Sequence, residues 1–179
     1  PIISNLICAK MDVDLQRLAR DSGCRYTRYA DDMTFSTRKS GFPERIAHFG
    51  KDGEIHLGND LEAVIHRNSF KLNLAKTRFS TSKQRQIVTG LKVNCFPNVP
   101  RSLLKQIRAM IHAREIYGLE KAELEFHAKF VRKHRAPSRG KPSFAQTLKG
   151  RLEFVGMIRG RNSPIFIKLA RKLRELEPN

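Results

Sequence analysis

The chain has 179 residues, and its 40% hydrophobic content is enough to bury a core in one or two compact units. Its formal net charge of +18 calls for a polyanionic partner such as nucleic acid. No apolar run approaches the roughly 20 residues that a helix needs to span a bilayer, which argues against a membrane segment.

The positive charge is concentrated in the second half of the chain. Residues 1–100 carry 16 Lys and Arg against 10 Asp and Glu (net +6), whereas residues 101–179 carry 19 against 7 (net +12). Contacts with a phosphate backbone come mostly from Lys and Arg, so the second half is predicted to follow such a backbone. The alternative is a basic surface that only keeps the protein soluble.

The cysteines indicate a reducing compartment. Cys8, Cys24 and Cys95 are odd in number and show no Cys-x-x-Cys spacing, and the sequence has no signal peptide. Reduced thiols in a cytoplasmic protein are therefore expected, and a structural zinc site is not.

A helix followed by a hairpin is predicted at the start of the chain. Residues 2–20 read as a helix that stops at Ser22 and Gly23. Its apolar side chains are expected on or near one side: Ile3, Leu6, Ile7, Val13, Leu15 and Leu18. Residues 25–37 alternate with the period of a β-hairpin, which puts Asp31 and Asp32 at its tip.

Two adjacent carboxylates on a tight turn repel each other unless a cation neutralises them. Hard oxygen ligands favour Mg²⁺, which completes its coordination with water and substrate phosphates. Asp31 and Asp32 are thus predicted to bind a divalent metal. The alternative for the dipeptide alone is a solvated turn, because acidic residues are common turn formers.

Residues 38–96 are predicted to continue a mixed α+β unit. A short helix is possible over 43–49, and a second helix is predicted over 61–68. Alternating apolar residues predict strands at 70–74, 86–88 and 91–95, with a turn over 80–85.

Beyond Pro97 and Pro100 the pattern is helical. From residue 101 to 117, Leu104, Ile107 and Ile111 form an apolar stripe on one helix face. A second stripe is basic and either follows a phosphate backbone or is simply solvated: Arg101, Lys105, Arg108 and His112.

The rest of the second half is read as a basic loop and two helices. The loop over 132–142 has two prolines and is expected to contact nucleic acid through five basic residues: Arg132, Lys133, Arg135, Arg139 and Lys141. The helix over 143–158 has an apolar edge made by Phe144, Leu148, Leu152 and Val155. Ser163 and Pro164 supply an N-cap and a first-turn proline for a helix over 165–176.

Four segments resemble reverse transcriptases, in the same order along the chain. Residues 28–36 read RYADDMTFS, which is similar to the catalytic hairpin of the bacterial, retron-type branch. Residues 1–6 read PIISNL, like the end of the family's Ser-Pro-x-x-Ser-Asn-Leu segment, and residues 73–77 read NLAKT, like its Asn-x-x-Lys-Thr element. Residues 88–94 read VTGLKVN, which is similar to the segment that closes the palm on the primer. Four ordered motifs make chance resemblance very unlikely.

The resemblance implies roles for particular residues. Asp31 is the first choice as a metal ligand and Asp32 the second, and Lys76 is expected near the triphosphate, where it could protonate the leaving pyrophosphate. The alternative for Lys76 is a solvated lysine. Residues expected at the nucleotide or primer are Tyr29, Ala30, Ser4, Asn5, Asn73, Gly90 and Leu91. The safer interpretation of Ser4 and Asn5 is that they cap the first helix.

The resemblance also implies a fold and a mechanism. Residues 1–96 are expected to form part of a polymerase palm, an antiparallel sheet with helices on one face, with its catalytic hairpin at 25–37. Residues 97–179 are expected to form a helical thumb. The implied reaction is two-metal transfer of deoxynucleotides onto a primer, with Mg²⁺ as cofactor and with a structured RNA template and an RNA–DNA duplex as partners.

Three functions remain possible from the sequence. The first is a retron-type enzyme that copies its own noncoding RNA and serves phage defence, which the VTG at 88–90 favours. The second is a relative of group II intron or other defence-associated reverse transcriptases, and the third is a non-catalytic RNA-binding module that has kept the fold.

A start in the middle of a motif suggests part of a longer protein. In the family, one metal-binding aspartate and the fingers lie earlier in the sequence. The chain alone is therefore expected to lack polymerase activity and to self-associate through unpaired strand edges.

Overall fold

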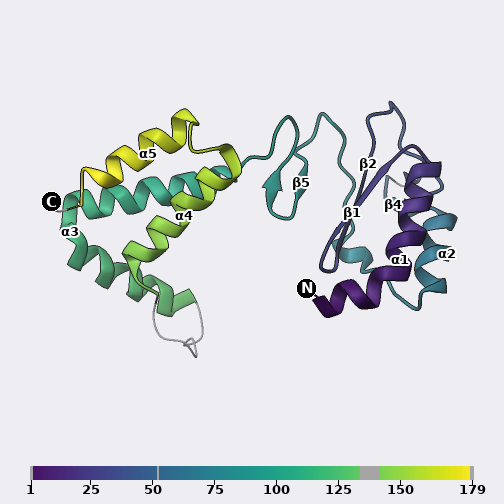
Figure 1. Cartoon of the computed structure of the whole chain (residues 1–179), viewed down its shortest axis with the longest axis horizontal. Coiled ribbons are helices and arrows are strands. Elements are labelled where there is room, and N and C mark those ends of the chain that lie inside the picture. Colours follow the sequence, from purple (N-terminus) through teal and green to yellow (C-terminus); the bar gives the residue numbers. More distant parts are fainter. Residues whose placement is uncertain (1, 52, 134–141, 178–179) are drawn as a thin grey trace. The chain divides into compact units, whose positions relative to one another are not determined.

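The computed structural model describes residues 2–51, 53–133 and 142–177, and it divides into two compact units, unit 1 over residues 1–89 and unit 2 over residues 90–179 (Figure 1). Helices and small antiparallel strand pairs make this a mixed α and β chain, as predicted. The assignment of the two parts as palm and thumb stays a prediction. Within the described ranges, no helix is both long and apolar enough to cross a membrane.

Unit 1 combines two helices with short hairpins. Its elements are α1 (Ile2–Asp21), β1 (Arg25–Tyr29), β2 (Asp32–Ser36), β3 (Ala47–Phe49), β4 (Ile55–Leu57), α2 (Asn59–Arg67), the 3₁₀ turn η1 (Leu74–Lys76) and β5 (Ile87–Val88). β5 pairs with β6 (Leu91–Lys92).

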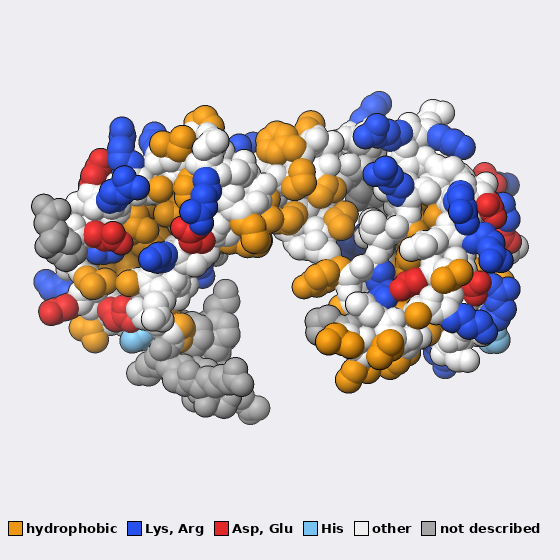
Figure 2. Space-filling view, in the orientation of Figure 1, with side chains coloured by type: hydrophobic (Ala, Val, Ile, Leu, Met, Phe, Trp, Pro, Cys, Tyr) orange, Lys and Arg blue, Asp and Glu red, His pale blue; other side chains and the backbone are white. Residues whose placement is uncertain are grey.

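The predicted first helix is confirmed, but its buried face differs from the predicted one. The helix ends before Gly23, whose φ of 69° lies in the left-handed region that glycine tolerates. The buried stripe is Cys8, Met11, Leu15 and Leu18, with a spacing of three and four residues. Ile3, Leu6, Ile7 and Val13 are exposed instead, and Figure 2 shows apolar side chains gathered at the N-terminal end of α1.

The core of unit 1 lies between α1, α2 and the first hairpin. Leu61 and Ile65 of α2 are buried with the α1 stripe and with Ile46, and Tyr26 and Phe35 of the hairpin pack against this cluster. The second helix is therefore confirmed, and it begins two residues earlier than predicted.

Three other predictions for unit 1 were wrong. Residues 43–46 make a single turn, with the amides of Ile46 and Ala47 donating to the Pro43 carbonyl, and β3 follows in place of the predicted helix. Residues 70–73 have no regular structure and 74–76 form η1 in place of a strand. The expected single sheet is replaced, in the described part of the chain, by three separate two-stranded ribbons.

Unit 2 is built from helices. They are α3 (Arg101–Lys133), α4 (Phe144–Arg159) and α5 (Pro164–Arg174). α3 is two helical segments joined at Gly118, whose φ of 75° and ψ of 170° interrupt the helical path. The predicted helix over 101–117 therefore ends where glycine permits a sharp change of direction.

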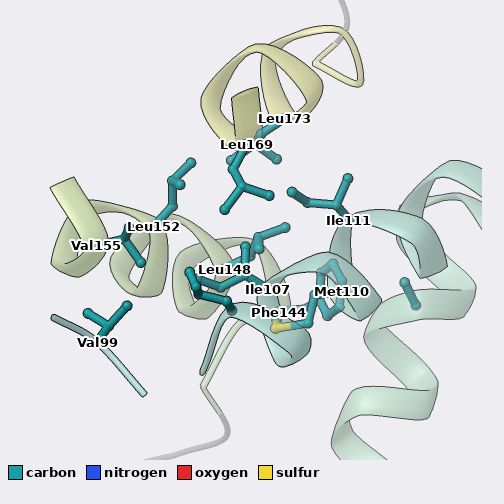
Figure 3. Packing of buried hydrophobic residues seen from close by; sticks show 12 residues of the cluster. Val99, Ile107, Met110, Ile111, Phe144, Leu148, Leu152, Val155, Leu169 and Leu173 are labelled. Carbon is teal, nitrogen blue, oxygen red and sulfur yellow. The ribbon is translucent and has the colours of Figure 1, made fainter. Parts of the chain in front are cut away.

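The predicted apolar stripes of unit 2 form one core (Figure 3). Ile107 of α3 is buried together with Leu148 and Val155 of α4 and Leu169 of α5, each at most 3% exposed. Each such side chain contributes about 1.5–3 kcal/mol when it is removed from water.

The two predicted helix starts in unit 2 differ in their caps. The Ser143 hydroxyl accepts the Gln146 amide at the start of α4, as expected for an N-cap. Ser163 occupies the N-cap of α5 ahead of Pro164, but its hydroxyl makes no capping bond. The proline alone provides the expected start signal there.

Candidate functional site

The hairpin of β1 and β2 presents the two adjacent carboxylates. Tyr29 pairs with Asp32 in the last register position, so Ala30 and Asp31 form a two-residue loop. Ala30 has a φ of 55°, which costs an L residue energy, but two-residue hairpin loops favour a positive φ. The predicted position of Asp31 and Asp32 at the tip is confirmed.

Both carboxylates are exposed and available to a ligand. Neither Asp31 nor Asp32 has a hydrogen-bond or ion-pair partner among the residues that the structure describes. Tyr29, the cross-strand partner of Asp32, is 71% exposed, so it can contact a bound molecule on the same face of the hairpin. The turn therefore carries two unneutralised acidic groups beside an exposed aromatic ring.

Beneath this turn, a nearly buried arginine connects the hairpin to α1. The Arg28 side chain is 6% exposed and forms a forked pair with Asp12 of α1. Its Nε donates to Asp12 Oδ1 at 2.8 Å and its Nη2 donates to Oδ2 at 2.6 Å. The Tyr26 hydroxyl also donates to Asp12 Oδ1, at 2.8 Å. Such two-point charged hydrogen bonds are among the strongest in proteins.

The same arginine reaches the turn itself. Arg28 Nη1 donates to the Ala30 carbonyl at 2.6 Å, and the Ser4 hydroxyl donates to that carbonyl at 3.3 Å. Arg28 Nη2 also donates to Asn5 Oδ1 at 3.3 Å. Ser4 and Asn5 lie inside the first turns of α1, so the predicted capping role was wrong.

Sequence reasoning missed Arg28 and Asp12 as parts of the site. Arg28 lies on the same strand face as Tyr26, which packs against the core. A charged side chain that faces a core is rarely buried unless an acidic group pairs with it. The position of Arg28 on the core-facing side of the strand could therefore have indicated an acidic partner such as Asp12.

The network shifts the acidity of its members. The hydrogen bond from Arg28 holds the pKa of Asp12 below its ordinary value, although partial burial opposes this. Burial, helped by the bond to Asp12, raises the pKa of the Tyr26 hydroxyl, and the bond to Asp12 raises the pKa of Arg28. All three groups therefore keep their charge states across the neutral range.

The donor set of the turn fits Mg²⁺ in part. Carboxylate oxygens are the ligands this ion prefers, and Asp31 and Asp32 offer them side by side. Within the described ranges, no group of three or more His, Cys, Asp or Glu side chains could hold a metal ion. The two aspartates thus provide part of a metal site.

Lys76 lies at the end of the 3₁₀ turn η1. Its amide donates to the Asn73 carbonyl at 3.0 Å, and the Thr77 hydroxyl donates to the same carbonyl at 3.2 Å. The side chains of Lys76 and Asn73 are exposed. The local turn is therefore set by the backbone of Asn73, and the role of Lys76 stays a prediction.

Gly90 and Leu91 lie at the small hairpin of β5 and β6. Gly90 has a φ of 81° and Thr89 a φ of 46°, so the turn uses two residues in the left-handed region. Leu91 is partly buried against the core of unit 2. The primer contact predicted for Gly90 and Leu91 stays a prediction.

The basic stripe predicted on α3 is solvent-exposed. The four residues on it are Arg101, Lys105, Arg108 and His112. Part of the stripe borders a groove of about 380 Å³ between α3 and α5. The groove has an apolar floor of Ile111, Ile165 and Leu169 and a polar rim of Arg108, His112, Glu115, Lys168 and Lys172.

Lys168 and Lys172 extend the basic surface beyond the predicted residues. They lie four residues apart on α5, a spacing that puts them on one helix face and could have been recognised in the sequence. On the same rim, Glu115 Oε2 lies 3.8 Å from His112 Nδ1. Arg108, Lys168 and Lys172 have no acidic partner in the described part of unit 2.

The basic loop predicted over 132–142 falls largely outside the described residues. Arg135, Arg139 and Lys141 lie in the segment 134–141, which the structure does not describe. Arg132 and Lys133 belong to the end of α3 rather than to a loop.

Comparison with known proteins finds retron reverse transcriptases. The chain is 37% identical over 121 residues to the retron Mx162 reverse transcriptase of Myxococcus xanthus, an alignment that covers 64% of this chain and 25% of that protein. It is 32% identical over 126 residues to the retron Ec86 reverse transcriptase of Escherichia coli, with 70% of this chain and 35% of that protein covered. The retron Mx65 reverse transcriptase of Myxococcus xanthus is 32% identical over 112 residues, with 63% and 24% covered.

The chain spans about a quarter to a third of the length of these relatives. No protein-family model matches it. The resemblance derived from the four motifs is confirmed by these relatives, all of which are named retron reverse transcriptases.

Proposed function

From this similarity to retron-type reverse transcriptases, we propose that the protein is an RNA-directed DNA polymerase whose catalytic hairpin is β1–β2. The observation that carries this proposal is the exposed pair Asp31 and Asp32 on a turn that α1 supports from below. A merely solvated turn needs no such support, whereas here the Ala30 carbonyl accepts hydrogen bonds from both Ser4 of α1 and Arg28 of β1.

Asp31 and Asp32 would hold Mg²⁺ through their carboxylate oxygens, together with acidic groups from elsewhere in the complete protein. Bound magnesium would stabilise the charge that develops on the attacking and leaving oxygens of nucleotidyl transfer. The exposed ring of Tyr29 would pack against the primer end or the nucleotide, with Ala30 forming the turn beside it.

Other residues that precede α3 would serve the nucleotide and primer. Lys76 would approach the triphosphate, and its exposed position at the end of η1 supports this role. Asn73 would orient Lys76, because its carbonyl accepts a hydrogen bond from the Lys76 amide. Gly90 and Leu91 would contact the primer from the β5–β6 turn. Ser4 and Asn5 are hydrogen-bonded to the hairpin. We therefore propose that their main role is to support the hairpin, and that any contact with template or nucleotide is secondary.

Unit 2 would bind the structured RNA template and the RNA–DNA duplex. Arg108, Lys168 and Lys172 surround one groove without acidic partners in the described residues, and Arg101 and Lys105 continue the basic face along α3. Such cations gain binding energy by releasing counterions from a phosphate backbone. Arg132, Lys133, Arg135, Arg139 and Lys141 would supply further phosphate contacts on account of their charge.

The retron type is the branch that the relatives favour, because each of those reported carries that name. Copying of its own noncoding RNA and a part in phage defence follow as proposals from that branch. Free thiols at Cys8, Cys24 and Cys95 are compatible with the cytoplasm of a bacterium. The second candidate is a group II intron-like or other defence-associated enzyme, which the Asp31–Asp32 turn supports equally.

The 179-residue chain by itself is proposed to bind nucleic acid without polymerising. Within the described residues, no third acidic side chain joins the two aspartates to complete a metal site. Its exposed apolar side chains at the start of α1 would favour self-association at high concentration.

Primer extension on an RNA template by the full-length protein tests the assignment. Asp31→Asn should lower the rate by about a thousandfold or more, because it weakens one metal ligand at almost unchanged volume. Asp32→Asn should also be severe. RNA affinity and thermal stability should stay at wild-type values in both.

Asp21→Asn is the matched control, since it makes the same change at an exposed carboxylate near the end of α1. Near-normal DNA synthesis by Asp31→Asn would refute the assignment of the hairpin. A wild-type protein that binds RNA but never extends a primer would favour the non-catalytic module.

A further inference from the structure

The turn that carries Asp31 and Asp32 depends on one carbonyl. The Ala30 carbonyl immediately precedes Asp31, and it accepts hydrogen bonds from Arg28 Nη1 at 2.6 Å and from the Ser4 hydroxyl at 3.3 Å. Together with the positive φ of Ala30, these bonds fix the plane of the peptide that joins Ala30 to Asp31, the two residues of the loop.

Arg28 can do this because its other donors are already committed. Its Nε and Nη2 form the forked pair with Asp12, so the guanidinium plane is fixed before Nη1 reaches the turn. Asp12 is in turn held by the Tyr26 hydroxyl. The chain of contacts therefore runs from α1 through Asp12 and Arg28 to the backbone of the turn.

Arg28 does not touch the carboxylates. Tyr29 and Asp32 are cross-strand partners, so their side chains share the hairpin face opposite to that of Arg28. Within the described residues, Arg28 pairs with Asp12 and leaves both turn aspartates without a cationic partner. Its positive charge thus stabilises the support of the turn without competing for the acidic groups.

We propose that Arg28 is a positioning residue, which through the Ala30 carbonyl sets the direction in which Asp31 and Asp32 present their oxygens to a divalent cation. Asp12 and Ser4 are its partners in this role. The proposal rests on the proposed function, because it assumes that the two aspartates bind metal. A lysine cannot replace the arginine here, since one ammonium group cannot bond Asp12 at two points and also reach the turn.

The test is Arg28→Lys in the full-length protein, with three measurements. Hydrogen exchange of the amides of residues 29–33, followed by mass spectrometry without metal, should be faster than in the wild type because the turn opens more often. Mn²⁺ affinity, measured from the free-ion signal by electron paramagnetic resonance, should fall by about tenfold. Primer extension should need more Mg²⁺ to reach half its maximal rate.

Arg67→Lys is the matched control. Arg67 also pairs with an aspartate of α1, because its Nη2 lies 3.0 Å from Asp14 Oδ2. It belongs to α2, and among the described residues it makes no hydrogen bond or ion pair with the turn. This variant should leave the exchange of residues 29–33, the Mn²⁺ affinity and the Mg²⁺ requirement unchanged. An equal effect of the two variants would mean that Arg28 acts only through general stability.

Ser4→Ala is a second test variant, for use if Arg28→Lys does not fold. It removes one donor to the Ala30 carbonyl and leaves the pair of Arg28 and Asp12 intact, so a smaller change in the same direction is expected. Wild-type exchange and Mn²⁺ affinity in Arg28→Lys, or in Ser4→Ala if the former unfolds, would overturn the proposal.

The two proposals can fail separately. If Asp31→Asn leaves Mn²⁺ binding and DNA synthesis intact, the proposed function fails, whatever Arg28→Lys does. If Asp31→Asn abolishes both while Arg28→Lys changes neither exchange, affinity nor Mg²⁺ requirement, the hairpin is catalytic and the role of Arg28 is refuted.

Discussion

Unit 1 and unit 2 are stabilised in different ways. In unit 2, side chains of α3, α4 and α5 meet in one continuous apolar core, and the cations of the groove lie outside it on the exposed surface. In unit 1, a smaller apolar cluster lies beside a polar network in which Asp12, Arg28 and Tyr26 join α1 to the hairpin.

This difference indicates which substitutions should affect each unit most. Hydrogen bonds depend steeply on angle and distance, so they suit a turn that must aim two carboxylates. Apolar packing is non-directional and tolerates small adjustments, so it suits a scaffold that presents cations to a flexible polyanion. Substitutions in the two units should therefore separate catalysis, binding and stability.

The largest effect on stability should come from the core of unit 2. Leu148→Ala removes a side chain with 0% exposure, and it should cost about 2–5 kcal/mol through lost burial and the cavity left behind. Hydrogen exchange read by mass spectrometry should show faster opening of α3, α4 and α5, with the amides of unit 1 unaffected.

Leu124→Ala is the control for this change, because Leu124 of the same unit is 71% exposed. It should change the free energy of unfolding by no more than about 0.5 kcal/mol. Equal acceleration of exchange in α1 and α2 by Leu148→Ala would show that the units unfold together.

A binding effect of intermediate size should come from the groove of unit 2. Replacing Arg108, Lys168 and Lys172 together by Ala should weaken RNA binding by roughly tenfold to a hundredfold and should reduce the slope of log affinity against log salt by about 2 to 3. The maximal rate of extension at saturating template should change little, since these cations lie in the other unit.

The matched control removes three charges elsewhere in unit 2. Lys121, Lys149 and Arg174 are exposed and do not line the groove. If their replacement by Ala flattened the salt dependence as much as the groove variant did, net charge rather than the groove would determine the affinity.

The smallest effect should be a pH dependence in unit 1. The hydrogen bond from Arg28 lowers the pKa of Asp12 in the folded state from an ordinary value of 3.8, and Tyr26 donates to the same carboxylate. A lowered folded pKa adds stability that is fully present above the ordinary value and is lost as the pH falls through the folded value. The wild type should therefore exceed Asp12→Asn in stability at pH 7, and the difference should shrink below about pH 4.

Thermal unfolding of the two proteins between pH 7 and pH 2 measures this difference. Asp14→Asn is a useful comparison, because the pKa of Asp14 is lowered by its bond to Asn68 and not by a contact with the hairpin. A stability gap between wild type and Asp12→Asn that stayed constant down to pH 2 would contradict the linkage.

Local pattern predicted the long helices well and the short elements poorly. The stripe of Leu104, Ile107 and Ile111 was correct because apolar residues spaced by three and four positions have few alternative interpretations. Residues 43–49 and 70–74 were wrong because short apolar runs also suit turns and irregular segments that pack against a helix.

The sequence by itself determined the helices over 101–117, 143–158 and 165–176 and the hairpin with Asp31 and Asp32 at its tip, because apolar periodicity and turn chemistry are local properties. It did not predict that α3 continues beyond Gly118 to Lys133. It also determined the kinship with retron reverse transcriptases. Tertiary structure decided which face of α1 is buried, that Asp12 meets Arg28 across 16 positions, and that Lys168 and Lys172 join Arg108 at one groove. The reason is that these contacts join residues distant in sequence, and their partners are chosen by how helices and strands pack rather than by any neighbour along the chain.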